Sequence, residues 1–222
     1  MYKKLKDRNE AILWARDLIR RKDWLIIDTE TTGLKESDEI IQIGIIGPHG
    51  NIVFESLLNP VKRRISSEAK LKHGIDLHML KDAPTFKDIY PKLYNILNGK
   101  LVVAYNIEFE NRILMQTTKK YACEAPNVQN IKFELQCAMH RYSGFIGEWS
   151  DYHKDYEWQK LPGAAHNVIE DCLAVLNIIK EMANAELSPI PDPWWKTLLN
   201  FFRRKKKINI QLSKNEAGSE MG

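Results

Sequence analysis

The stretch that most constrains this chain is residues 24–34, which read WLIIDTETTGL. Four large apolar residues with β-branched character open it, a pattern typical of a buried strand. Side chains alternate faces along a strand, so we expect Asp28 and Glu30 on one face and Thr29 on the other. Two neighbouring carboxylates at a buried strand end repel each other unless a cation lies between them, and Mg²⁺ prefers carboxylate oxygens. The alternative is a polar strand end that happens to carry two acids.

Length and composition restrict the class of protein. The 222 residues are enough for one domain with a core, or one domain and an appendage, and 44% hydrophobic with 28% charged residues indicates a soluble globular chain. The charged N-terminus has no signal-peptide core, and no apolar run reaches membrane-spanning length. Cys123, Cys137 and Cys172 are far apart and odd in number, which argues against a disulfide framework and a zinc site. We therefore expect a cytoplasmic protein without integral membrane association.

The net charge of +4 is unevenly distributed along the chain. From Ser188 onward there are seven of the 33 basic and three of the 29 acidic residues, so the tail carries +4 and the rest is neutral. A neutral body is unlike a protein that holds long nucleic acid by charge alone.

The apolar spacing predicts a mixed α/β fold. Short connectors at 33–39 and 47–50 favour an antiparallel meander of the first three strands. In such sheets, sites collect at the carboxyl ends of strands, where Asp28, Glu30 and Asn106 lie. The predicted strands are 24–29, 40–46, 51–58 and 101–104, with 131–137 a weaker strand or loop; the predicted helices are 7–21, 66–74, 85–97, 109–121 and 167–185, with helix and ordered loop in 136–161.

The chain is expected to divide into a domain at 1–187 and a tail at 188–222. Prolines make 188–193 a non-helical linker, before an aromatic segment at 194–202 and five basic residues at 203–207. The last fifteen residues look disordered. The tail could lie on an anionic membrane, fold back, dock on a partner such as a polymerase, or contact nucleic acid. We prefer a partner or nucleic-acid contact.

Three motifs now stand in order: DTETTGL at 28–34, AYNIEFE at 104–110 and HNVIED at 166–171. Together they resemble the DEDDh 3′→5′ exonucleases, the family that includes the proofreading subunit of bacterial replicases and ribonuclease T. The resemblance covers roughly residues 14–186, includes HGID at 73–76 and APTF at 83–86, and looks most like phage or prophage members. It implies a ribonuclease H-like fold, in which a mixed five-stranded sheet (a three-strand antiparallel meander plus parallel strands) is flanked by helices.

The implied chemistry needs these residue types. Two cations, Mg²⁺ or Mn²⁺, roughly 3.5–4 Å apart can stabilise the attacking and leaving oxygens of an in-line displacement. Carboxylates from several elements must hold them: Asp28 is placed to bridge both ions, Glu30 to hold one, and Asp171 to contribute from the last helix. His166, on the loop before that helix, suits a general base. The resemblance implies the same roles for the matching positions.

One motif position departs from the family. The second motif usually ends in aspartate, where this chain has Glu110. Glutamate keeps the charge and adds a methylene, so it could reach the same ion, or misplace the ligand by about an ångström at a cost on the order of 100-fold. We keep Glu110 as a ligand and expect Glu108 to point elsewhere on the helix.

The same resemblance assigns substrate contacts to Thr31, Leu34, Glu68, His73 and Asn106. Plainer interpretations exist for most of them: Glu68 as a solvated helix residue, His73 as a loop residue, Leu34 as core and Asn106 as a backbone-bonding residue. The aromatic residues between 142 and 158 could stack bases, although packing of a long loop explains them better.

The sequence thus predicts a metal-dependent exonuclease that releases nucleoside 5′-monophosphates from a 3′ end. We favour single-stranded DNA as the substrate, in proofreading or in DNA repair and processing. Two alternatives stay open: an oligoribonuclease that trims RNA by the same mechanism, and a non-catalytic nucleic-acid or polymerase-binding module with a weakened metal site.

Overall fold

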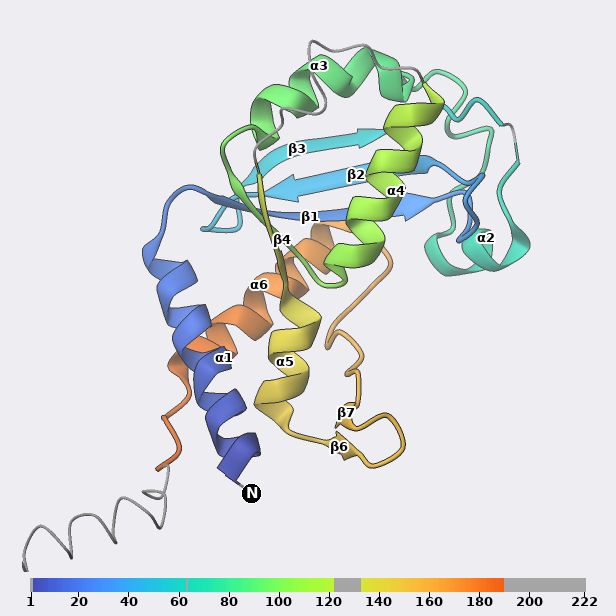
Figure 1. Cartoon of the computed structure of the whole chain (residues 1–222). Coiled ribbons are helices and arrows are strands. Elements are labelled where there is room, and N and C mark those ends of the chain that lie inside the picture. The colour runs from blue at the N-terminus through green and yellow to red at the C-terminus, as the bar shows by residue number, and fades with distance from the viewer. Residues whose placement is uncertain (1, 63, 122–132, 190–222) are drawn as a thin grey trace, which may run out of the picture. The chain divides into compact units, whose positions relative to one another are not determined.

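A mixed five-stranded sheet forms the centre of the fold (Figure 1). The computed structural model describes residues 2–62, 64–121 and 133–189. The sheet order is β3-β2-β1-β4-β5, with β1 to β3 antiparallel and β4 and β5 parallel to β1. The predicted meander with added parallel strands is therefore confirmed. The strands are β1 (Trp24–Thr31), β2 (Ile40–Ile46), β3 (Ile52–Leu57), β4 (Leu101–Ala104) and β5 (Glu134–Cys137).

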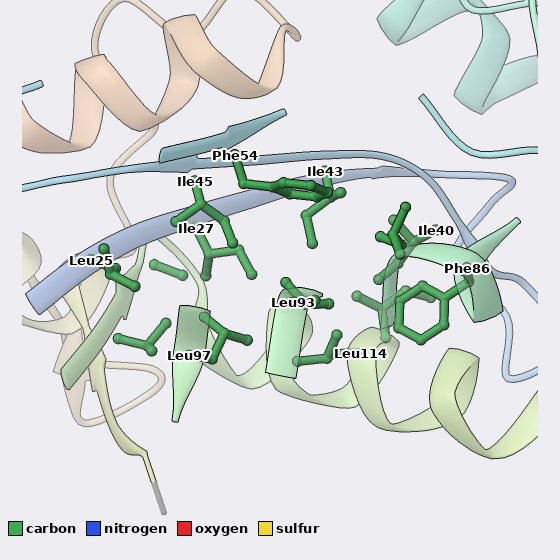
Figure 2. Close-up of a cluster of buried hydrophobic side chains, with 14 of the residues drawn as sticks. Leu25, Ile27, Ile40, Ile43, Ile45, Phe54, Phe86, Leu93, Leu97 and Leu114 are labelled. Carbon is green, nitrogen blue, oxygen red and sulfur yellow. The ribbon is translucent and has the colours of Figure 1, made fainter. Parts of the chain in front are cut away.

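Helices cover both faces of the sheet, and alternation along β1 decides which side chain meets which layer. Leu25 and Ile27 pack with α3 (Phe86–Leu97) and α4 (Ile107–Lys120), in the cluster that Figure 2 shows. Trp24 and Ile26 pack with α1 (Tyr2–Arg20), α5 (Ala138–Ile146) and α6 (Val168–Asn184). The short helix α2 (Ser67–His73) buries none of its residues. Most of its side chains are exposed, and only Ala69 and His73 are half-buried.

Polar side chains set the ends of the helices near the sheet edge. The Asn167 side chain accepts from the backbone N–H groups of Ile169 and Glu170, which caps α6. The Asn106 side chain accepts from the N–H of Phe109 and caps α4. Thr85 is the N-cap residue of α3, and its backbone N–H donates to Asp88 Oδ2. Asn106 belongs to the second sequence motif and Asn167 to the third, so capping places the motif residues that follow them on the first helical turns.

Several predicted boundaries were wrong by a few residues. α1 begins at Tyr2 rather than residue 7, because its charged first turns form helix without an apolar stripe to reveal them. β1 runs to Thr31, and pairing with β2 through a bulge after Glu30 explains the two extra residues. The stretch 136–161 holds the predicted helix, but its ordered loop also contains a hairpin of β6 (Trp149–Ser150) and β7 (Asp155–Tyr156).

The chain separates into two units, Asp7–Leu187 and a second unit of residues 1–6 with Ser188–Gly222. The aromatic and basic segments of the predicted tail lie outside the described residues. The predicted boundary at 187 and the role of the tail therefore remain predictions. Among the helices that the structure describes, none is long and apolar enough to cross a membrane.

Candidate active site

The two acids of the first motif lie where β1 meets the N-terminus of α6. Asp28 and Glu30 follow Trp24 and Ile26 in the alternation of β1, and so share the face covered by α6. Asp28 pairs in register with Gly44 of β2. A Cβ at Gly44 would lie 2.7 Å from Val168 Cγ2. The absence of a side chain at Gly44 therefore lets α6 approach the strand that carries both acids.

The third motif brings its histidine and aspartate to the same place. His166 lies on the loop before α6 and adopts a left-handed backbone conformation with φ of 56°. The N–H of Ala165 donates to Asp171 Oδ1 at 2.7 Å, which ties the loop to the first turn of the helix. Ligand atoms of Glu30, His166 and Asp171 all lie within 4.8 Å of one another. The structure thus brings Glu30 next to His166 and Asp171, which lie 136 and 141 positions further along the chain.

Glu110 enters from the opposite face of the sheet. It is buried in the first turn of α4, and its Oε2 accepts a hydrogen bond of 2.7 Å from the hydroxyl of Thr29. Glu108 is exposed, as predicted. Thr29 points away from Asp28 and Glu30, also as predicted, and that orientation is what allows it to hold Glu110.

Burial and mutual repulsion govern the charge of these carboxyls. Burial, then the charges of Glu110, Asp171 and Glu30, raise the pKa of Asp28 well above its ordinary value. Burial and the Asp171 charge raise the pKa of Glu30 to about 7. Burial raises the pKa of Glu110 to about 8, against the hydrogen bond from Thr29, which lowers it. Without a counter-charge, this cluster holds protons up to neutral pH.

A hard divalent cation fits this donor set. Converging carboxylate oxygens are ligands for Mg²⁺ or Mn²⁺, and a cation offsets the burial and the mutual repulsion that raise the three pKa values. Amide side chains at these positions would be polar without repelling one another. The presence of carboxylates instead of amides is therefore the observation that points to a cation.

Comparison with known proteins agrees with this geometry. Residues 25–179 match the RNase T family of exonucleases. The chain belongs to this exonuclease family. Its sheet and flanking helices are those of ribonuclease H-like exonucleases, and its membership makes it a DEDDh-type 3′→5′ exonuclease, a nuclease of the hydrolase class.

Relatives share most of the chain. An uncharacterized exonuclease of Escherichia phage 186 is 35% identical over 181 residues, which covers 74% of this chain and 92% of that protein. The DNA polymerase III subunit epsilon of Buchnera aphidicola subsp. Schizaphis graminum is 27% identical, covering 83% of this chain and 84% of the subunit. Exonuclease I from Methylocaldum szegediense shares the fold with a TM-score of 0.55 at 17% identity, over 74% of this chain and 41% of that structure.

Two residues predicted to contact substrate, His73 and Thr31, form hydrogen bonds within the chain of this exonuclease. Because the N–H of Ile75 donates to His73 Nδ1, the ring proton lies on Nε2, which is 3.2 Å from the carbonyl oxygen of Thr31. Burial lowers the pKa of His73, which favours this neutral form. The Thr31 hydroxyl donates to the carbonyl of Gly33. His73 thereby ties α2 to the end of β1, and substrate contact for both residues stays a prediction.

The other three predicted contacts differ in exposure. Leu34 is 70% exposed, so the interpretation of this residue as core is wrong. Glu68 is exposed, and its own backbone N–H and the hydroxyls of Ser66 and Ser67 lower its pKa. Asn106 caps α4, which confirms the backbone-bonding interpretation. Of these three side chains, Leu34 and Glu68 are open to a ligand of the exonuclease.

Sequence reasoning assigned no role to Thr29 or Gly44. From the sequence, a threonine between two acids on a strand is expected only to point to the opposite face. Its partner on that face, Glu110, follows from the position of α4 in the fold. Gly44 lies within an isoleucine-rich strand, and a glycine inside a strand pattern is the signal of close approach that could have identified it.

Proposed function

We propose that this exonuclease hydrolyses the terminal phosphodiester bond at the 3′ end of a nucleic acid strand and releases nucleoside 5′-monophosphates. The observation that carries the proposal is the convergence of Glu30, His166 and Asp171 beside Asp28 in a chain of this family. Single-stranded DNA is the proposed substrate, because the neutral body offers little charge for holding a duplex.

The proposed cofactors are two Mg²⁺ or Mn²⁺ ions, held by Asp28, Glu30, Glu110 and Asp171. When bound, such ions stabilise the attacking and leaving oxygens of an in-line displacement. His166 takes the proton from the attacking water, and its exposed position on the loop gives its ring access to solvent and substrate. The bond from Ala165 to Asp171 keeps that loop against the helix during the proton transfer.

Partners and location are also proposals. The relative from Buchnera is a subunit of DNA polymerase III. A protein partner of that kind, contacted through residues 194–207, would give this chain a role in proofreading, whereas action alone would suit DNA repair or processing. Cys137 and Cys172 are free thiols, which suits the cytoplasmic location that the sequence predicts.

The decisive experiment uses a 5′-labelled single-stranded DNA and the matching RNA, each with Mg²⁺, Mn²⁺ or EDTA, resolved on a gel. We expect a ladder that shortens from the 3′ end, is absent in EDTA and forms faster on DNA. Faster cleavage of RNA would favour the RNA-trimming alternative. Folded protein that cleaves neither strand in either metal would refute catalysis and favour the non-catalytic binding module.

A further inference from the structure

Residues 62–73, which include α2, form a basic segment in a domain that is neutral as a whole. Residues 62–73 contain five lysines and arginines and one acid, Glu68, whereas residues 1–187 carry equal numbers of both signs. The segment includes α2, which buries none of its residues. Lys70 and Lys72 lie on α2 and the other three basic residues precede it, so the segment as a whole offers a positive surface for a polyanion.

Two bonds hold this segment at the edge of the candidate active site. The N–H of Ser66 donates to the carbonyl of Thr32 at 2.8 Å, and His73 bonds the carbonyl of Thr31. Thr31 and Thr32 directly follow Glu30 on the chain. Both ends of α2 are therefore fixed to the strand end that carries the first motif, so its side chains are in constant relation to the carboxylate cluster.

Within α2, two lysines differ in their partners. Lys70 forms an ion pair with Asp76. Lys72 is exposed and forms no ion pair with any residue in the part of the chain that the structure describes. Its positive charge nevertheless acts on Glu30 and opposes the rise in the pKa of that carboxyl. Lys72 directly precedes His73, whose ring bonds the carbonyl of Thr31, so Lys72 lies at the end of α2 that is fixed beside Glu30.

We propose that Lys72 binds a backbone phosphate of the substrate strand beside the carboxylate cluster. The ammonium group is a compact positive charge with three donors on a flexible stem, which suits a phosphate oxygen near fixed carboxylates. Leu71, the neighbour of Lys72 in the chain, is 88% exposed and offers apolar surface for a sugar or base. This inference rests on the proposed function, since it assumes that a nucleic acid strand enters this site.

The test compares Lys72→Gln with a matched control, Lys70→Gln, in the full chain. Binding of a fluorescein-labelled single-stranded oligonucleotide is followed by anisotropy in EDTA, over a series of salt concentrations. A lost phosphate contact on a single strand should lower the slope of log Kd against log salt by about 0.7 and weaken binding about tenfold at low salt. Lys70→Gln should keep the wild-type slope, because Asp76 already neutralises Lys70.

Two further measurements separate phosphate binding from a structural role. Lys72→Arg should restore the slope, and Lys72→Gln should bind Mn²⁺ as tightly as the wild type or more tightly, since a positive charge near the acids is removed. Weaker Mn²⁺ binding by Lys72→Gln would mean that Lys72 shapes the metal site, and would overturn the proposal. Equal slopes for wild type and Lys72→Gln, including no binding by either, would also overturn it. Absence of cleavage on the gel instead refutes the proposed function, while the anisotropy slopes still test Lys72.

Discussion

At the scale of single residues, the Thr29 hydroxyl is a side-chain donor that favours the charged form of Glu110, the form that a cation would bind. Its hydrogen bond lowers the pKa of Glu110 against the burial that raises it to about 8. Thr29→Val preserves shape and strand propensity but removes the donor, so the pKa of Glu110 rises further and a proton competes with the cation. We expect Mn²⁺ affinity at neutral pH to fall about tenfold, measured by titration calorimetry.

The matched control at this position is Thr29→Ser, which keeps the hydroxyl and should bind Mn²⁺ nearly as the wild type does. An unchanged affinity in Thr29→Val would show that Glu110 contributes to cation binding without help from Thr29, or does not contribute. Glu110→Gln distinguishes these two cases, because it loses affinity only if the carboxylate is a ligand.

A second prediction at the residue scale concerns His166. Removing a general base should reduce kcat by roughly 100-fold to 10,000-fold. Because His166 has φ of 56°, His166→Ala adds backbone strain, whereas asparagine tolerates this conformation and still cannot act as a base. Both variants should lose activity in a single-turnover cleavage assay while calorimetry shows Mn²⁺ binding within a few-fold of wild type. Full activity in His166→Asn would exclude the general-base role.

The sequence allowed most of these residues to be identified, because motif order and strand alternation do not depend on distant contacts. The motifs alone assign Asp28, Glu30, His166 and Asp171 to one site, and the geometry brings the last three of these within 4.8 Å of one another. The hydrogen bond from Thr29 to Glu110 was not predictable. It depends on how closely α4 approaches the sheet, which packing decides rather than local sequence.

At the scale of secondary-structure elements, the approach of α6 to the sheet sets the distance between Asp171 and the acids of β1. Gly44→Ala would place a Cβ 2.7 Å from Val168 Cγ2 and 2.8 Å from Val168 Cβ, so α6 must shift. We expect a loss of about 1–3 kcal/mol in the free energy of unfolding, measured by urea denaturation. A displacement near one ångström should also lower kcat by roughly 100-fold.

Gly144→Ala is the control for that substitution. Gly144 lies in α5, where an added Cβ would meet its nearest neighbours at 3.9 Å, an ordinary contact. Alanine there should leave activity unchanged and raise stability by about 0.5–1 kcal/mol. If Gly44→Ala loses stability but keeps wild-type kcat, the approach of α6 at Gly44 does not position the catalytic groups.

Element types were predictable where apolar spacing was regular, and their ends were not. The periodic helix at Val168–Asn184 and the isoleucine-rich strand at Ile40–Ile46 matched expectation closely. The first turns of α1 and the β6–β7 hairpin lie in charged or aromatic sequence without a clear period, so tertiary contacts decide their form. One such contact is the hydroxyl of Tyr156, which donates to Asp7 Oδ2 at 2.8 Å.

At the scale of the whole molecule, the acid cluster makes stability depend on pH and on cations together. In the unfolded chain these carboxyls have ordinary values, 3.8 for aspartate and 4.5 for glutamate, whereas folding raises the pKa of Glu30 to about 7 and of Glu110 to about 8. At pH values between the ordinary pKa and the raised pKa of each group, the folded chain binds more protons than the unfolded chain. The free energy of unfolding therefore decreases as pH rises through this range.

We therefore expect the Tm of the metal-free protein to fall by several degrees between about pH 5 and about pH 8, measured by differential scanning calorimetry in EDTA. Mg²⁺ or Mn²⁺ should reverse this loss, and by more at higher pH, because a cation binds the deprotonated carboxylates of the folded state. Glu30→Gln should flatten the metal-free profile, whereas Glu108→Gln, at an exposed position of α4, should leave it unchanged. A metal-free Tm that stays constant over this range would mean that folding does not raise the pKa values of Asp28, Glu30 and Glu110, and the cation site built from them would lose its physical basis.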